Sequence, residues 1–214
     1  MSEAMAGFLF FGPGEGAAFE AAALLANSTG VLIDKSEANV AAFRKRGFAA
    51  ERADLLDYKH RNVARGAFVI DVVQELGGRA EFNQALIGAV RAATDYIIVQ
   101  HPYFDEDSGL ALRGLQVPGH FGKKIKYRPT IADYANFVAA NSEGLQISGV
   151  AAFVSGKATA TPLNLPGSVL RNVPESVEVP KTIRVLIGRK DISRFYGVLD
   201  RARFGKQILL WEWL

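Results

Sequence analysis

The stretch from Phe8 to Asp34 constrains the fold of this chain more than any other part of the sequence. It begins with FLFF, a short apolar run typical of a strand buried on both faces, and the turn GPGEG follows at once. The alanine-rich run 17–26 predicts a helix, and VLID (31–34) predicts a second buried strand that ends in a carboxylate. Strand, glycine turn, helix, strand and acid form the first half of a nucleotide-binding sheet.

The residues of the turn suit a bound ligand. A chain that leaves a buried strand and enters a helix within five residues needs unusual dihedral angles, and a ligand lying against the backbone leaves no room for a Cβ atom. Asp34, at the tip of the neighbouring strand, can accept hydrogen bonds from both hydroxyls of a ribose. The predicted cofactor-binding residues of this region are Gly12, Pro13, Gly14, Glu15, Gly16, Asp34 and Lys35.

The pattern of glycines bears on which nucleotide binds. A dinucleotide site usually reads GxGxxG, and Ala17 stands at the third position, which that pattern tolerates. However, the third glycine falls at Gly16, and Glu15 would face a pyrophosphate with a negative charge. An NAD(P)-dependent oxidoreductase is therefore the less favoured interpretation. The turn instead resembles motif I of the class I S-adenosylmethionine-dependent methyltransferases, in which GPGEG and an alanine-rich helix are common.

This resemblance implies a fold, a cofactor and a reaction. The fold is α/β: a Rossmann-like seven-stranded, mostly parallel sheet with helices on both faces and an antiparallel final strand pair. The cofactor is S-adenosylmethionine, and the reaction is methyl transfer to an unidentified small-molecule or glycan-like acceptor. The family usually has an acidic residue two positions before the first glycine, where this chain has Phe10. A non-catalytic methyltransferase-like scaffold or binding protein therefore remains the alternative.

The end of the third predicted strand also matches the family. There, an acidic or polar side chain meets the adenine amino group while an apolar neighbour packs on the ring, and Asp54 and Leu55 fit these two positions. The other interpretation of Asp54 is that it caps the N-terminus of a helix formed by the following LLDYKHRNVA.

Composition limits the class of protein. The chain has 214 residues, 49% of them hydrophobic, which suits one core, and it has no cysteine for disulfides or thiolate metal sites. A net charge of +3 is too small to argue for nucleic-acid binding. We see no signal peptide and no membrane span, and we expect a cytoplasmic protein. We expect a methyltransferase-like domain over 1–190 and a C-terminal extension over 191–214 that packs on the same domain or on a partner, and a homo-oligomer stays open.

The remaining elements follow from local patterns. Ser36 is a candidate cap for a helix that ends at Gly47, and RAEFNQALIGAVRAA has helical spacing of its apolar residues. Thr130 and Asp133 form a candidate capping pair for a later helix. The last two β-rich stretches, LQISGVAAFVSG and KTIRVLIGRK, are joined without a helical pattern and should therefore be antiparallel.

Polar residues follow the fourth and fifth predicted strands, at the rim where ligands bind in open parallel sheets. Asp71 interrupts the fourth strand, which therefore either ends there or turns Asp71 toward the cleft. Gln74, a cofactor-binding candidate, and Glu75 come next, and His101 follows the fifth strand. His120 lies in a loop with four basic residues (Lys123, Lys124, Lys126 and Arg128) that could form a lid and attract an anionic acceptor.

The catalytic candidates are Glu75, His101 and His120. Each has a plainer interpretation: Glu75 as a solvated loop residue, His101 as a structural hydrogen-bonding group, and the basic loop around His120 as a solvated surface.

Overall fold

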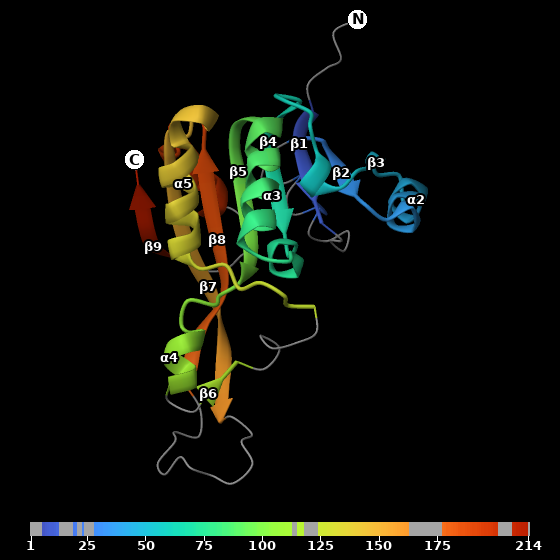
Figure 1. The fold of residues 1–214 in the computed structure, drawn as a ribbon. Coiled ribbons are helices and arrows are strands. Elements are labelled where there is room, and N and C mark those ends of the chain that lie inside the picture. Colours follow the sequence, from blue (N-terminus) through green and yellow to red (C-terminus); the bar gives the residue numbers. More distant parts are fainter. Residues whose placement is uncertain are drawn as a thin grey trace, which may run out of the picture.

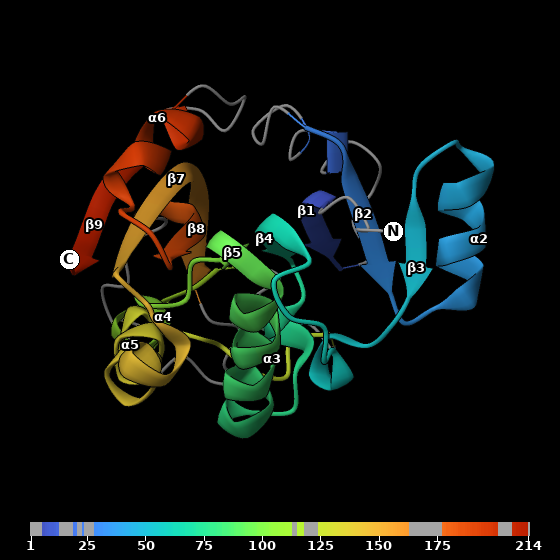
Figure 2. The ribbon, with the colours of Figure 1, turned by 90° about the horizontal axis from the view of Figure 1, so that it is seen from above.

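The computed structural model describes residues 6–12, 19–20, 23, 28–112, 115–117, 124–162, 177–200 and 207–213. These residues form one sheet with helices on both faces (Figures 1 and 2). The strands are β1 (Ala6–Phe11), β2 (Gly30–Asp34), β3 (Ala50–Arg52), β4 (Ala64–Ile70), β5 (Ala93–Pro102), β6 (Leu115–Gln116), β7 (Gly149–Pro162), β8 (Val177–Gly188) and β9 (Gln207–Trp213). The helices are α2 (Glu37–Lys45), α3 (Arg79–Ala92), α4 (Asp107–Leu112), α5 (Ile131–Leu145) and α6 (Ser193–Asp200), with 3-10 turns η1 (Leu55–Asp57) and η2 (Val73–Glu75).

The strand order confirms the predicted fold class. The order is β3-β2-β1-β4-β5-β8-β7-β6, and β9 also pairs with β7. The strands from β1 to β5 are parallel, whereas β8 runs antiparallel to β5, and β7 antiparallel to β8. β1 is the middle one of the five parallel strands, with Phe10 opposite Leu32 of β2 and Phe68 of β4. The chain therefore folds into a mostly parallel sheet in which the last two long strands, β7 and β8, form an antiparallel pair.

The predicted count of seven strands is wrong, because the described residues form nine. The seven strands from β3 across to β7 match the prediction, and β6 and β9 add to them. Both pair with β7, which at 14 residues is long enough to hold β9 along 150–155 and β6 at 161–162. β6 has only two residues, too few to show a periodic pattern, and β9 lies in the C-terminal stretch where the sequence pattern was weak.

Alternation along the central strands divides the core into two faces. Leu9 and Phe11 of β1 face α3 and α5, in a cluster that includes Phe82 and Phe137 of those helices. Phe8, Phe10 and their neighbours form the second cluster on the opposite face, where the helical residue Phe19 and parts of α2 and α6 pack. Figure 2 shows α3 and α5 on one side of the sheet and α6 on the other. Both faces are covered, as in α/β proteins with parallel sheets.

The helix caps form largely as the sequence predicts. The Ser36 hydroxyl accepts a hydrogen bond from the Asn39 N–H at 3.4 Å, and Thr130 and Asp133 make both bonds of a capping box at the start of α5. The segment after Asp54 differs from the expected helix, since it forms only the 3-10 turn η1. Its polar second half, KHRN, has no apolar stripe that could pack against the sheet.

An arm extends from one end of the sheet. The β7–β8 hairpin runs past the other strands, and α4 and β6 lie beside its far half (Figure 1). A small separate core holds them together: Leu110 of α4, Leu115 of β6 and Val179 of β8 are buried in one cluster. The arm lies at the end of the sheet where the parallel strands finish. β5 ends there at Pro102, and α4 of the arm is the next element along the chain.

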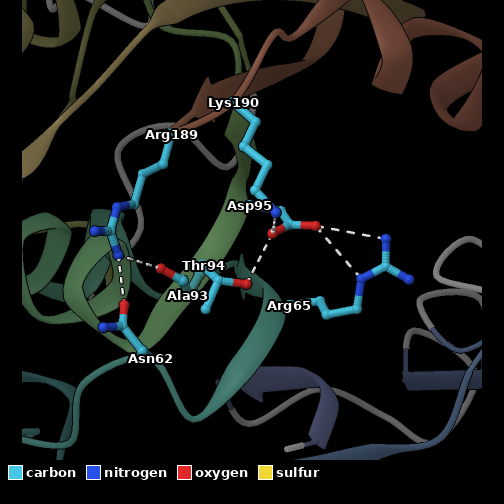
Figure 3. Close-up of polar contacts among 7 residues, drawn as sticks. All are labelled: Asn62, Arg65, Ala93, Thr94, Asp95, Arg189 and Lys190. Carbon is cyan, nitrogen blue, oxygen red and sulfur yellow. Dashed lines mark hydrogen bonds and ion pairs between the residues drawn. The ribbon is translucent and has the colours of Figure 1, made fainter.

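A polar network fixes the opposite end of the sheet (Figure 3). Asp95 of β5, only 4% exposed, accepts hydrogen bonds from Lys190 at 2.5 Å and from Arg65 at 3.4 Å. Arg189 donates to the Ala93 carbonyl and to the Asn62 side chain, both at 2.7 Å. The network therefore joins the end of β8 to the starts of β4 and β5.

No helix among the described residues is long and apolar enough to cross a membrane.

Candidate functional site

A pocket of about 380 Å³ lies where the parallel strands end. Its walls include Gly12 after β1, Asp34 at the end of β2, Asp54 and Leu55 after β3, and Glu75 after β4. These residues are far apart in sequence, and the parallel arrangement brings their strand ends to one edge of the sheet. The volume lies within the usual range for small-molecule sites.

Gly12 occupies a position that only glycine can fill. Its φ angle is +130°, outside the regions that other residues readily adopt. A Cβ atom built on Gly12 would lie 2.6 Å from the Ile70 carbonyl oxygen and 2.6 Å from Cγ2 of Val72. The first glycine of the turn is therefore required both by its dihedral angle and by the close approach of the chain after β4. The other residues of the predicted turn, Pro13, Gly14, Glu15 and Gly16, lie outside the described residues.

Asp34 is a buried carboxylate at the edge of the pocket, only 7% exposed. Its Oδ1 accepts a hydrogen bond from the Ser36 N–H at 2.7 Å, and its Oδ2 accepts one from the Asn39 side chain at 3.0 Å. A carboxylate has about four acceptor positions, so these two bonds orient the group and still leave capacity for two donors. Lys35 lines the same pocket and is exposed.

Asp54 and Leu55 form the neighbouring wall. Asp54 caps the turn η1, since its Oδ1 accepts a hydrogen bond from the Leu56 N–H at 3.0 Å. Both of the roles considered for Asp54 remain compatible with this geometry, because the bond to Leu56 uses one carboxylate oxygen and the residue still lines the pocket. Leu55 is 7% exposed and gives that wall an apolar surface.

The segment after β4 supplies the third wall. Glu75 lines the pocket, whereas Gln74 does not. Gln74 is 8% exposed, and its Oε1 has no hydrogen-bond partner among the described residues. The Gln74 carbonyl accepts hydrogen bonds from the N–H groups of Lys126 at 2.8 Å and Tyr127 at 3.2 Å. These bonds tether the end of the basic loop over the pocket.

The two histidine candidates have different outcomes. His101 is fully buried, and its ring stacks against Phe104 and Tyr134 on the face of the sheet covered by α5. Its Nδ1 donates to the Pro102 carbonyl at 2.7 Å. His101 does not line the pocket, and its contacts are those of a structural residue. His120 lies outside the described residues.

Sequence reasoning missed three groups of residues at this edge. Ser36 and Asn39 orient Asp34, and Val72 and Glu81 line the pocket. For Ser36 and Asn39, the only signal in the sequence was their position shortly after Asp34, at the start of a predicted helix. A third group consists of Ser155 of β7 and Arg184 of β8, which meet Gln100 of β5, a residue that the sequence does place at this rim, only because these strands are neighbours.

Comparisons with known proteins define the fold. No family model matches the sequence, and no curated protein matches it. Solved structures do match. A SAM-dependent methyltransferase from Archaeoglobus fulgidus is 12% identical with a TM-score of 0.60, and the match covers 85% of each chain. A SAM-dependent methyltransferase from Thermotoga maritima, named as a possible histamine N-methyltransferase, is 13% identical with a TM-score of 0.53, over 88% of this chain and 84% of that one.

A third match carries a ligand. Magnesium protoporphyrin IX methyltransferase from Synechocystis PCC 6803, with bound SAH, is 11% identical with a TM-score of 0.53, over 86% of this chain and 74% of that one. At such low identities the likeness concerns the fold. The chain therefore has the Rossmann-like fold of SAM-dependent methyltransferases, which confirms the resemblance inferred from the turn at Gly12 at the level of architecture.

Proposed function

We propose that this protein is an S-adenosylmethionine-dependent methyltransferase that acts on a small-molecule acceptor. The observation that carries the proposal is the pocket itself. It combines a buried carboxylate at the end of β2 with a glycine whose Cβ would not fit, at the ligand-binding edge of this fold. Gln74 precedes the pocket residue Glu75, and its buried Oε1, which has no hydrogen-bond partner among the described residues, is a further acceptor that a ligand's N–H or O–H could satisfy.

The residues fit the cofactor in parts. Asp34, oriented by Ser36 and Asn39, would accept the ribose hydroxyls. Asp54 would accept from the adenine amino group through the oxygen that Leu56 does not use, while Leu55 packs on the ring. Gly12 would form the turn beside the ligand, because its φ of +130° and its close approach to the chain after β4 leave no room for a side chain. These roles are the ones that the resemblance of the sequence implied.

The sulfonium methyl is already a strong electrophile, so the cofactor supplies the reactivity. What the protein must add is positioning of the acceptor in line with the methyl group and removal of a proton where the acceptor atom carries one. Glu75, which lines the pocket, is placed to contact an acceptor.

The acceptor is proposed to be anionic. Lys124 and Lys126 line the pocket and are exposed, and neither forms an ion pair with another described residue. Arg128 differs, since its Nε lies 3.9 Å from a carboxylate oxygen of Asp107. Since these two lysines lie at the pocket and have no ion-pair partner in the part of the chain that the structure describes, they would raise the local concentration of an anion. This is tested with acceptor pairs that differ only in a carboxylate or its amide: K124A/K126A should reduce the preference for the carboxylate.

One observation favours a non-catalytic alternative. Phe10 is fully buried against Phe19 on one face of the sheet, and its side chain does not line the pocket. The acid that the family usually places there is missing. A methyltransferase-like scaffold, which keeps the fold and has lost the cofactor, would show this feature.

Calorimetric titration separates the two interpretations. An enzyme should bind S-adenosylmethionine and S-adenosylhomocysteine, each with one site per chain. A protein that binds neither at millimolar concentration would be a scaffold. NADH serves as the control ligand, because an oxidoreductase would be stabilised by NADH and not by S-adenosylhomocysteine.

A further inference from the structure

The exposed apolar side chains of this protein are concentrated on one strand. Five large hydrophobic residues are exposed in the part of the chain that the structure describes, and four of them belong to β9: Ile208, Leu209, Leu210 and Trp213. Their exposed fractions lie between 41% and 59%. Single exposed apolar residues are common on protein surfaces, whereas a contiguous group of them is typical of a surface that binds another protein.

β9 is also an edge of the sheet. It pairs with β7 on one side, and no other described strand pairs with it on the other side. Figures 1 and 2 both show β9 at the end of the sheet opposite β2 and β3. An edge strand presents backbone N–H and C=O groups that have no partner in the sheet, and these groups can pair with a strand of another chain.

The two edges of the sheet are built differently. The opposite edge, β3, has only three residues, and two of them, Glu51 and Arg52, are exposed and charged. The Nε of Arg44 in α2 donates to the Ala50 carbonyl of β3 at 3.0 Å. Short length, charge and covering are the usual means by which proteins prevent edge-to-edge pairing. β9 has seven residues, no lysine, arginine or proline, and one acid, Glu212. The sequence therefore blocks pairing at β3 and permits it at β9.

The pairing with β7 distinguishes the centre of β9 from its ends. Leu209 pairs with Phe153 and Trp211 pairs with Ala152, so Leu210, the middle residue of β9, has no partner on β7. Trp211 is partly buried and packs against the core cluster that includes residues of α5. β9 therefore contacts β7 in two segments, on either side of an exposed leucine.

The exposed apolar area of β9 is a large part of what a stable dimer needs. An exposed fraction near one half corresponds to about 100 Å² for a large apolar residue, so the four residues together expose about 400 Å². A stable interface buries about 800 Å² on each partner. α5 lies next to β9 in both views, and its exposed residues include Ala139 and Ala140, whose small side chains allow another helix to approach closely. A second copy that contacts both β9 and α5 would supply the remaining area.

We propose that β9 is the interface of a homodimer, in which β9 of a second copy packs antiparallel against it about a twofold axis near Leu210. A twofold axis brings the same patch of both copies together, so each apolar strand is covered by an identical apolar strand. The axis keeps the two Glu212 residues about 13 Å apart along the strands, at about 3.3 Å per residue. This separation exceeds the Debye length of about 8 Å at physiological salt, so the repulsion between the two carboxylates is largely screened.

Sedimentation velocity of the full chain tests the dimer. The wild-type protein should have twice the mass of one chain at micromolar concentration. L210E brings one carboxylate from each copy to the axis, and like charges at an interface should raise the dissociation constant of the dimer by about a hundredfold or more. L112E is the matched control, because it makes the same substitution at the exposed leucine of α4, outside β9, and it should stay dimeric.

A mixture of opposite charges identifies the partner. L210K should be monomeric by itself, and an equimolar mixture of L210K and L210E should form dimers, because the axis then brings opposite charges together. Only a second copy of this chain can give such complementation.

A thermal melt checks that each variant folds, and single cysteines keep the test open if L210E does not. The chain has no cysteine of its own, so Ile208→Cys, Leu209→Cys or Leu210→Cys can form a disulfide only with a second copy. The cysteine nearest the axis should crosslink under mild oxidation, whereas Leu112→Cys should not.

Three results would overturn the proposal. In the first, the wild-type protein is monomeric at micromolar concentration, so that another molecule must cover β9. In the second, L210E folds and stays dimeric, which assigns the dimer to another surface. In the third, the mixture of L210K and L210E stays monomeric, or none of the single cysteines in β9 crosslinks, so that no twofold axis lies at this strand. All three leave the proposed function intact, because none of them concerns binding of the cofactor.

Discussion

Replacement of Asp34 separates its role in the fold from its role in binding. Asp34→Ala removes the acceptor of two hydrogen bonds, from the Ser36 N–H and from the Asn39 side chain, at a position only 7% exposed. Each donor left without a partner costs about 1 kcal/mol or more when buried. Both donors are half-buried, so solvent can reach them in part, and we expect Asp34→Ala to lower the free energy of unfolding by about 2 kcal/mol.

Asp34→Asn is the sharper variant. Its amide oxygen can still accept from Ser36, and its NH₂ can donate to Asn39 once the Asn39 amide turns over. The fold should therefore change little. Binding should change more, because a hydrogen bond to a charged group contributes about 1 kcal/mol more than one to a neutral group. Two ribose hydroxyls then give a loss of about 2 kcal/mol, or about 30-fold in the dissociation constant.

Calorimetry with S-adenosylhomocysteine measures the binding, and urea denaturation measures the stability. Asp57→Asn is the matched control, because Asp57 is exposed, carries the same charge and does not line the pocket. If Asp34→Asn binds S-adenosylhomocysteine within twofold of the Asp57→Asn control, Asp34 does not hold the ribose, and its role is only to begin α2.

Gly12→Ala should lower the free energy of unfolding, measured by urea denaturation, by about 2 kcal/mol or more, because its Cβ would lie 2.6 Å from other atoms at a residue with positive φ. The control Gly144→Ala, in α5 with open space around it, should raise the free energy of unfolding by about 0.5–1 kcal/mol. For Asp95, burial raises the pKa, but hydrogen bonds from Lys190 and other neighbours lower it further, so its net pKa is below the ordinary value. Ionised Asp95 therefore stabilises the fold above pH about 4, and that contribution is lost as the pH falls through the lower folded pKa. Asp95→Asn should cost about 1 kcal/mol at pH 7 and should flatten the acid side of the stability profile; an unchanged profile would contradict this. Tyr134→Phe should not destabilise the protein and should raise its melting temperature slightly, because the fully buried Tyr134 hydroxyl has no hydrogen-bond partner among the described residues.

Local patterns in the sequence were enough to predict most of the central elements. Apolar runs predicted the buried strands around Phe10 and Leu32, and capping side chains predicted the helix starts at Ser36 and Thr130. The absence of a helical pattern between the last two long strands predicted the antiparallel pair β7–β8. The position of Asp34 at a strand end likewise followed from the chain itself, since the residue after a short apolar run must emerge at the edge of the sheet.

The sequence was less informative where short elements take their conformation from a neighbour. β6 has two residues that are extended because β7 offers them an edge, and β9 follows the same strand with a register shift near Phe153. The expected helix after Asp54 shortened to one turn because its polar half has no surface to bury against. In these segments the local preference for helix or strand is weak, and contacts with neighbouring elements determine the conformation.

For the candidate site, the sequence by itself determined which residues stand at strand ends, namely Gly12, Asp34, Asp54 and Glu75. Only the tertiary structure decided that His101 is a buried ring stacked against Phe104 and Tyr134, whereas Asp71, directly after β4, is exposed. It also decided that Arg184, 84 residues after Gln100, donates to its side chain. The physical reason is that the face on which a strand residue lies follows from local alternation, whereas its neighbours on other strands follow from the strand order, which no local pattern contains.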